Sequence, residues 1–269
     1  PVAAHIRQRG TVMVEGSGTT RALQCPHHGW TYRLDGRLAA APHMGDQLAG
    51  SEVCLPRFAV AVWAGWVLVN LSGTAPSGGP TLDRLDEVLA GEQLTDLVSV
   101  GTLEYPSPWN WKISVENFVE SYHHQWVHPA SLQPGYPGGQ SFARHGDDEP
   151  WSAVDHVAVD EGNEPFLAAV VYPNLLFAAQ RGDGLLWFEL LPVDAESTQL
   201  RIHALLRSEL VEAGPRLLEG LAVINEEDIT VNQATAQGLA APSATAGPVS
   251  PLEEACWHFR RWLVGALRD

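Results

Sequence analysis

Five strand-like segments follow one another between residues 152 and 206, and helical patterns stand on both sides of them. Each segment is a short apolar run with turn residues at its ends, which is typical of β-strands. Apolar residues at helical spacing precede this block over residues 109–128, where Pro129 stops the helix, and follow it over 216–239 and 251–267. The pattern predicts an antiparallel sheet flanked by helices. The five segments are residues 154–159, 166–172, 175–180, 185–190 and 200–206.

The first 75 residues have a different pattern, one of short strands and tight turns. Apolar or alternating runs occupy residues 11–14, 21–24 and 66–71, and turn residues such as Asp35-Gly36 separate them. This pattern predicts a small all-β domain.

A Pro/Gly/Ser-rich stretch, Ser72–Pro80, is the candidate linker between the two patterns. Residues 82–89 after it have apolar side chains at helical spacing. Strands followed by a helix–sheet–helix block indicate two domains of different class, and thus an α+β protein. The expected division is an all-β domain over residues 1–75, a linker and helix over 76–98, and the helix–sheet–helix domain over 99–269.

The charge balance is strongly acidic, with 32 Asp and Glu against 16 Lys and Arg. An acidic surface disfavours phosphate backbones and anionic membranes, so we expect no nucleic-acid or membrane partner. No run of about 18 apolar residues is present to span a bilayer, and the first residues do not resemble a signal peptide. The three cysteines, Cys25, Cys54 and Cys256, are too sparse for a disulfide framework. They favour a reducing compartment, so we expect a cytoplasmic protein.

Three histidines and two glutamates gather within thirteen residues of one another, between Glu116 and His128. Two imidazoles and one carboxylate are a ligand set that leaves positions on Fe(II) open for dioxygen. The spacing leaves the choice of ligands open. His124 and His128 are four residues apart and share a helical face, whereas His123 and His128 reach one metal only if the helix ends or distorts between them. A helix with surface histidines is an equally good interpretation of the spacing.

This stretch resembles the active-site helix of Rieske non-haem iron oxygenase catalytic subunits. The resemblance rests on Glu116-Asn117-Phe118, on Glu120-Ser121-Tyr122-His123 and on His128-Pro129. It implies that His123 and His128 are iron ligands and that His124 is a neighbour. It also implies catalytic roles for Asn117 and Glu120. In the family an acidic residue at the position of Glu120, usually aspartate, links the iron-ligand histidine to a cluster-ligand histidine of the adjacent subunit.

The third iron ligand is implied by a second segment, Glu226 to Leu239, which resembles the late helix of the same family. The match places the ligand carboxylate at Asp228. Glu226 and Glu227 are adjacent carboxylates that can be confused with it or can be plain surface charge. Asn232 stands where many relatives have Glu.

The segment Cys25-Pro26-His27-His28-Gly29-Trp30-Thr31-Tyr32 resembles the second half of a Rieske motif. Such clusters use two Cys on one iron and two His on the other, so Cys25 and His28 match one pair. In the first half, Ile6 stands at the Cys position and Gln8 at the His position. His5 is out of register, and Cys54 and Cys256 are poor substitutes. We therefore interpret the domain as N-terminally truncated and degenerate, and we do not expect it to assemble a stable [2Fe–2S] cluster.

The resemblance implies a helix-grip catalytic domain and an oxygenase that activates O2 at a mononuclear Fe(II). The expected reaction is hydroxylation, dihydroxylation or demethylation of a small aromatic or apolar organic substrate. A reductase or ferredoxin would donate electrons, and the expected assembly is a homotrimer or larger oligomer. Two alternatives stay open: a member without a resident cluster that takes electrons from a partner chain, and a protein that only binds a small ligand. Aromatic residues that can line a pocket, or belong to the core, are Trp126, Phe142, Phe166, Tyr172, Phe177, Trp187 and Phe188.

Overall fold

The computed structural model describes residues 11–16, 18–48, 52–71, 80–92, 94–180 and 182–268. The chain divides into two compact units, Pro1–Gly79 and Pro80–Asp269. Each unit has a hydrophobic core of its own. The expected domain limits at residues 75 and 98 stay a prediction. Apart from Pro80, the expected linker lies outside the described residues.

The first unit is built from short antiparallel strands, as expected for an all-β domain. A three-stranded sheet has the order β1-β2-β3, and a separate hairpin joins β4 to β5. The expected strand over residues 11–14 is wrong, because only Val12 there makes a bridge. The elements are β1 (Ala22–Gln24), β2 (Thr31–Arg33), β3 (Leu38–Ala40), the 3-10 helix η1 (Gly45–Leu48), β4 (Ala59–Trp63) and β5 (Trp66–Asn70).

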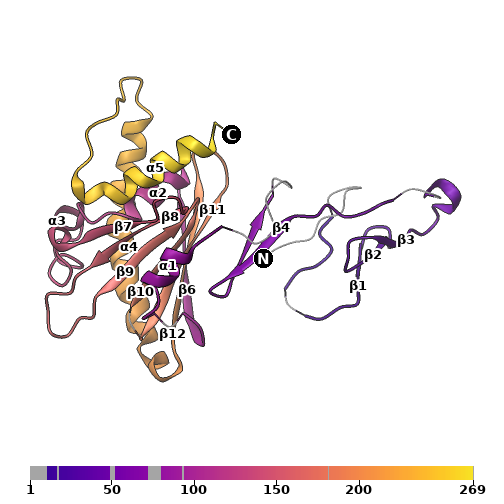
Figure 1. Cartoon of the computed structure of the whole chain (residues 1–269), viewed down its shortest axis with the longest axis horizontal. Coiled ribbons are helices and arrows are strands. Elements are labelled where there is room, and N and C mark those ends of the chain that lie inside the picture. The colour runs from indigo at the N-terminus through magenta and orange to yellow at the C-terminus, as the bar shows by residue number, and fades with distance from the viewer. Residues whose placement is uncertain are drawn as a thin grey trace. The chain divides into compact units, whose positions relative to one another are not determined.

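The second unit contains a seven-stranded antiparallel sheet with the order β6-β12-β11-β10-β9-β8-β7 (Figure 1). The antiparallel sheet expected from the sequence is therefore confirmed. Its two edge strands were not predicted, and β6 begins inside the segment expected to be linker and helix. The strands are β6 (Leu97–Ser107), β7 (Phe142–His145), β8 (Trp151–His156), β9 (Phe166–Val171), β10 (Leu175–Gln180), β11 (Gly184–Pro192) and β12 (Thr198–Arg207).

The helices of the second unit include one long helix, α4, that packs on β6 and β12. The single helix expected over residues 109–128 is wrong, because α2 and α3 are separated by five residues that belong to neither helix. The α-helices are α1 (Asp83–Val88), α2 (Trp111–Phe118), α3 (His124–Val127), α4 (Gly214–Leu239) and α5 (Glu254–Ala266). The 3-10 helices are η2 (Gly138–Gln140), η3 (Ser208–Ala213) and η4 (Pro251–Glu253).

The core of the second unit lies between one face of the sheet and three helices. Side chains alternate in burial along β12, so Leu200, Ile202 and Ala204 all face inward. Val115 of α2, Leu221 of α4 and Phe259 of α5 belong to the same cluster. These three helices therefore cover the same face of the sheet, which is the helix-grip arrangement expected.

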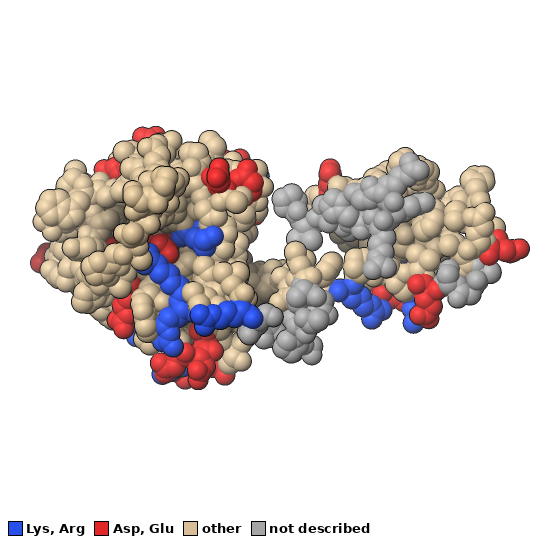
Figure 2. Space-filling view, turned by 90° about the horizontal axis from the view of Figure 1, so that it is seen from above, with Lys and Arg blue, Asp and Glu red and all other residues tan. Residues whose placement is uncertain are grey.

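Acidic and basic side chains lie next to one another on the second unit in the view of Figure 2. Arg260 pairs with Glu116 at 2.6 Å, and Arg144 pairs with Asp155. The expected lack of a nucleic-acid partner stays a prediction. Among the helices of the described ranges, none combines the length and apolar character that crossing a bilayer requires. All three cysteines are free thiols, as the sequence predicted.

Candidate metal centre

The interruption between α2 and α3 brings the two expected histidine ligands together. Helix α2 starts at an Asn110 cap, whose side chain accepts a hydrogen bond from the Lys112 N–H, and it ends at Phe118. Helix α3 starts only after His123. The rings of His123 and His128 therefore lie with their centroids 5.1 Å apart, which a continuous helix would not allow for residues five apart.

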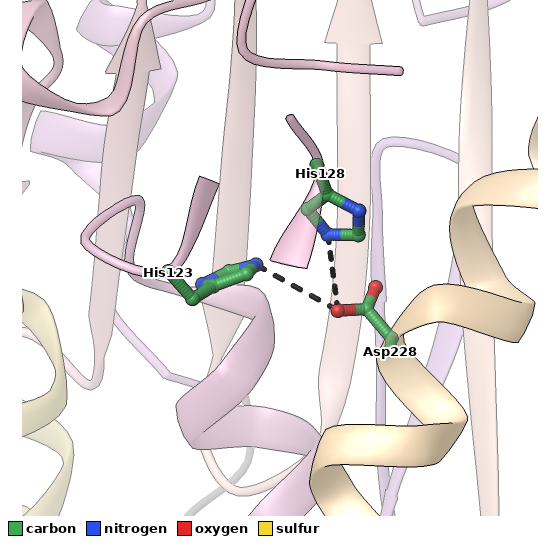
Figure 3. Close-up of side chains that lie close together, drawn as sticks. All are labelled: His123, His128 and Asp228. Atoms are coloured by element: carbon green, nitrogen blue, oxygen red, sulfur yellow. Dashed lines mark hydrogen bonds and ion pairs between the residues drawn. The ribbon is translucent and has the colours of Figure 1, made fainter. Parts of the chain in front are cut away.

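Asp228 of α4 completes a group of three potential ligands with these histidines (Figure 3). Its Oδ1 lies 3.1 Å from Nε2 of His128 and 3.7 Å from Nε2 of His123. One ligand atom from each residue lies within 4.8 Å of the others. The structure thus brings together the three residues named from the sequence, in a donor set that suits a divalent iron.

A carboxylate contacts Nδ1 of each of the two imidazoles. Glu120 Oε1 lies 2.5 Å from Nδ1 of His123, and Glu227 Oε2 lies 2.7 Å from Nδ1 of His128. When Nδ1 donates to a carboxylate, Nε2 is left with its lone pair for a metal, and its basicity rises. Ser131 donates a further hydrogen bond to Glu227. Both imidazoles are therefore oriented with Nε2 toward Asp228.

Asn117 and Glu120, the two residues expected to be catalytic, both contact members of the three-residue group. Asn117 donates from Nδ2 to Asp228 Oδ1 at 3.0 Å. Glu120 follows the end of α2, so it contacts His123 within the turn and not along a helical face. Its Oε2 accepts hydrogen bonds from the backbone N–H groups of Tyr122 and His123, so it also holds the turn together.

Glu227 is the residue that the sequence did not assign. It was interpreted as a carboxylate that can be confused with the ligand or as surface charge, and the structure places it against the fully buried His128. The two residues are 99 positions apart. The only signal in the sequence was its adjacency to Asp228, and adjacency alone does not say which way a helical side chain points.

His124, the alternative partner of His128 by spacing, lies elsewhere. It is 3% exposed, its Nδ1 donates to the Tyr136 carbonyl at 3.0 Å, and its ring stacks on His156. Burial lowers the pKa of His124 to about 4, and burial also holds the pKa of His156 well below its usual value. Burial alone would lower the pKa of His128 as well, but its hydrogen bonds to Asp228 and Glu227 outweigh that effect and raise it.

A cavity of about 300 Å³ adjoins the three-residue group. His156, Phe166 and Tyr136 form one part of its wall, with ring centroids 4.2 and 4.8 Å apart along the series. Of the seven aromatic candidates, Phe166 and Phe188 line the cavity. The other five do not: Trp126 and Phe142 are exposed, Tyr172 and Phe177 are buried in the core, and Trp187 stacks on His203.

The first unit holds one half of the expected cluster site. Cys25 is buried, and its Sγ accepts a hydrogen bond from the His27 N–H at 3.4 Å. Within the described ranges, no group of three or more His, Cys, Asp or Glu ligands includes Cys25 and His28. Ile6 and Gln8, at the other two positions, lie outside the described residues.

Family models match both units of the chain. The model described as the ring hydroxylating alpha subunit (catalytic domain) matches residues 94–269, and the Rieske [2Fe-2S] domain model matches residues 7–59. The chain therefore belongs to the Rieske oxygenase family. A Rieske [2Fe–2S] cluster is the cofactor expected for the first of these domains in the chain, and a mononuclear iron is the cofactor expected for the catalytic domain.

Curated relatives share moderate identity with the chain. Chloroplastic choline monooxygenase of Spinacia oleracea is 26% identical, over 97% of this chain and 63% of the relative. The glycine betaine monooxygenase oxygenase subunit of Chromohalobacter salexigens is 33% identical, over 47% of this chain and 29% of the relative. The chain spans 61% to 63% of the length of the choline monooxygenases that it matches.

Solved structures have the same fold. The quaternary ammonium Rieske monooxygenase CntA, in complex with an inhibitor, aligns with a TM-score of 0.77 and 22% identity, over 96% of this chain and 76% of that one. Naphthalene 1,2-dioxygenase with bound indole aligns with a TM-score of 0.69 and 17% identity, over 99% and 78% of the two chains. At these identities the likeness establishes the architecture.

Proposed function

We propose that His123, His128 and Asp228 hold one Fe(II), and that the chain is the oxygenase component of a Rieske monooxygenase. The observation that carries this proposal is the convergence of three donors, two of them oriented by carboxylates, at the edge of a cavity. Iron held by this ligand set keeps positions open for O2. Asn117 would orient the Asp228 carboxylate, and Glu120 and Glu227 would keep both Nε2 lone pairs available.

The substrate we propose is a small organic molecule with a quaternary ammonium group, instead of the aromatic or apolar compound expected from the sequence. The relatives are named for choline, glycine betaine and carnitine. Phe166, Tyr136 and Phe188 line the cavity beside the metal site with aromatic rings. Such faces attract a cation within about 6 Å of the ring centroid. The reaction would be monooxygenation of a carbon near the nitrogen.

The electron supply is the second part of the proposal. A Rieske-type [2Fe–2S] centre needs two thiolates, and Ile6 stands at the position of one of them, so this chain should not hold a stable cluster by itself. Electrons would come from a cluster in a partner chain, ultimately from a reductase or ferredoxin. Glu120, beside His123, is the residue through which they would reach the iron in a trimer or larger oligomer.

Iron and acid-labile sulfide analysis of anaerobically purified protein separates the possible functions. About one iron and no sulfide per chain is the expected result. About three irons with two sulfides per chain would mean a resident cluster. No iron, even after reconstitution with Fe(II), would leave only the ligand-binding function. Substrate-dependent O2 uptake with choline, carnitine and naphthalene, in the presence of an added electron donor, then tests the substrate class. A response to naphthalene alone would contradict our proposal.

A further inference from the structure

The cavity beside the metal site has two parts with different chemistry. Near the metal residues its wall consists of imidazoles and aromatic rings, among them His156, Phe166 and Tyr136. Farther along, the wall is aliphatic. The aliphatic lining comes from three strand residues on the face that the helices cover and from three residues of α4: Leu186, Ile202, Leu206, Leu217, Leu221 and Ile224.

The aliphatic part extends well beyond the reach of a small cation at the metal. Leu217 and Asp228 both line the cavity and both belong to α4. An α-helix rises 1.5 Å per residue, so these two positions are about 16 Å apart along the helix axis. A trimethylammonium head held at the aromatic end would leave the aliphatic end unfilled.

Small side chains on β9 and β10 leave room for a ligand. Ala168 and Ala178 are cross-strand neighbours and both line the cavity, so the floor there carries only methyl groups. Protein interiors are normally packed to crystal density. An unfilled apolar cavity costs stability and does not hold ordered water well. A space of about 300 Å³ with this lining is therefore suited to an apolar ligand group.

Polar residues at the turn between β10 and β11 lie between the two parts of the cavity. Gln180 and Asp183 line the cavity and are partly buried, and Gln180 has Phe166 and Gly184 as its cross-strand neighbours. The Gln180 side chain already donates to the Glu164 carbonyl at 3.2 Å. The leucine-lined part therefore lies on the β11 and β12 side of this turn, and the aromatic part lies on the β8 and β9 side.

We propose that the leucine-lined part of the cavity is a subsite for a flexible alkyl tail. The substrate class is then a quaternary ammonium ion with a medium-length unbranched chain, in contrast to a compact ion such as choline. This inference rests on the proposed function for the reacting head and adds the apolar tail to it.

The test is binding calorimetry on the iron-loaded full chain with two ligand series. The first series is alkyltrimethylammonium ions from ethyl to octyl, and the second is the neutral 1-alkanols of equal chain length. Affinity should rise about fourfold per methylene and then level off where the tail leaves the leucine wall. Equal affinity from ethyl to octyl in both series would overturn the subsite.

Two substitutions at Leu221, and a matched control, locate the tail. Leu221→Phe narrows the middle of the aliphatic part, so the affinity should stop rising at a shorter alkyl chain. Leu221→Ala widens it, so the affinity should level off only at a longer chain. Val223→Phe makes the same kind of change on the exposed side of α4 and should leave the series unchanged. If neither Leu221 variant moves the plateau while the rise persists, the tail binds elsewhere and the inference is wrong.

The two series also separate this inference from the proposed function. A rise with chain length for the alkanols, together with no binding of the ammonium ions, would uphold the tail subsite and overturn the quaternary ammonium head. Iron content, measured on the same samples, reports on the metal site independently of either ligand.

Discussion

His123 and His124 are neighbours in the sequence, but their imidazoles have different partners. His123 faces Asp228 and is held by Glu120, whereas His124 points to the Tyr136 carbonyl and to His156. We predict that His123→Ala abolishes iron retention and that His124→Ala keeps it, because only the first removes a ligand atom. Iron per chain after desalting measures this. The reverse outcome would show that the helical four-residue pair, His124 and His128, binds the metal.

A substitution at Glu227 tests whether a carboxylate that is hydrogen-bonded to a ligand imidazole changes the affinity for iron. Glu227→Gln keeps a hydrogen-bond acceptor for His128 but loses the charge that raises its basicity. We expect the iron dissociation constant to increase about 10-fold or more, the effect typical of such partners. Glu226→Gln is the control, because the Glu226 side chain is not a partner of His128. Equal iron affinity in both variants would mean that Glu227 is only a surface charge.

A substitution at Glu120 should have a different effect on iron binding from a substitution of an iron ligand. Glu120→Gln is expected to retain iron at saturating Fe(II) but to slow turnover with an external electron donor, because the residue lies beside His123 without reaching the metal group. Complete loss of iron in this variant would show that Glu120 itself binds the metal. Single-turnover rates with photoreduced donor, compared with iron content, distinguish the two roles.

The burial of His124 gives the iron-free protein a defined sensitivity to acid. Its pKa falls from 6.5 in the unfolded chain to about 4 in the folded one. Between these two values the unfolded chain takes up a proton that the folded chain does not, so the free energy of unfolding drops as the pH falls. The loss amounts to roughly 3 kcal/mol by pH 4.

Denaturant unfolding between pH 7.5 and 4 measures this loss. His124→Gln retains a donor for the Tyr136 carbonyl but does not titrate, so its profile should be flatter than that of the unmodified chain. The other groups around His124, namely His123, His128, Glu120 and His156, remain in the variant. Because the charge of His124 is one cause of the lowered pKa of His156, the difference between the two profiles contains the titration of His124 and its coupling to His156. If the free energy of unfolding changed with pH in the same way in both proteins, His124 would not be the source of the acid sensitivity.

At the scale of elements, the turn between α2 and α3 decides whether a metal site exists. The Ser121 hydroxyl donates to the Gly138 carbonyl at 3.0 Å, so the turn is fixed against the segment at the start of η2. A Cβ added at Gly138 would lie 2.0 Å from the Ser121 carbonyl oxygen, whereas one added at Gly139 would meet nothing within 4 Å.

Gly138→Ala is therefore expected to displace the turn and to weaken iron binding, even though residue 138 is not a ligand. Gly139→Ala should change neither iron binding nor stability appreciably. Thermal unfolding measured beside iron affinity separates a global loss of stability from a local displacement. Identical behaviour of the two variants would show that the contact at Ser121 does not position the histidines.

The sequence predicted the interior of the second unit well and its edges poorly. Apolar runs marked β9 to β12, and helical spacing marked α4. The edge strands β6 and β7 were missed because their burial is partial and their patterns are weak. The interruption after Phe118 was missed because helical spacing continues through it. Pro129 gave the end of the helical stretch but not the turn inside it.

The candidate ligands were named from a family resemblance, since spacing left the choice between His123 and His124 open. The contacts that distinguish them come from Glu120, Tyr136 and Asp228, and two of these are distant in sequence. Long-range partners of this kind, like the pairing of Glu227 with His128, depend on how helices pack and not on local pattern.

At the scale of the whole molecule, the cluster ligands decide where electrons enter. We predict that the unmodified chain shows no Rieske-type EPR signal and that the double variant Ile6→Cys and Gln8→His gains one, because it restores a thiolate and an imidazole. Acid-labile sulfide near two per chain is the matching chemical measurement. A signal from the unmodified chain would mean that our register for residues 1–10 is wrong.

The order of strands in the large sheet also has a consequence for folding. Strands β7 to β12 pair with their neighbours in sequence, but β6 pairs with β12, which joins residues roughly 100 positions apart, such as Leu103 and Ile202. Closing so long a loop loses chain entropy before the contacts form, and it is therefore slow. His123 and His128 lie inside that loop and Asp228 lies beyond it. Metal uptake during refolding should therefore begin only after β6 has paired with β12. Metal uptake is then a late marker of a completed fold.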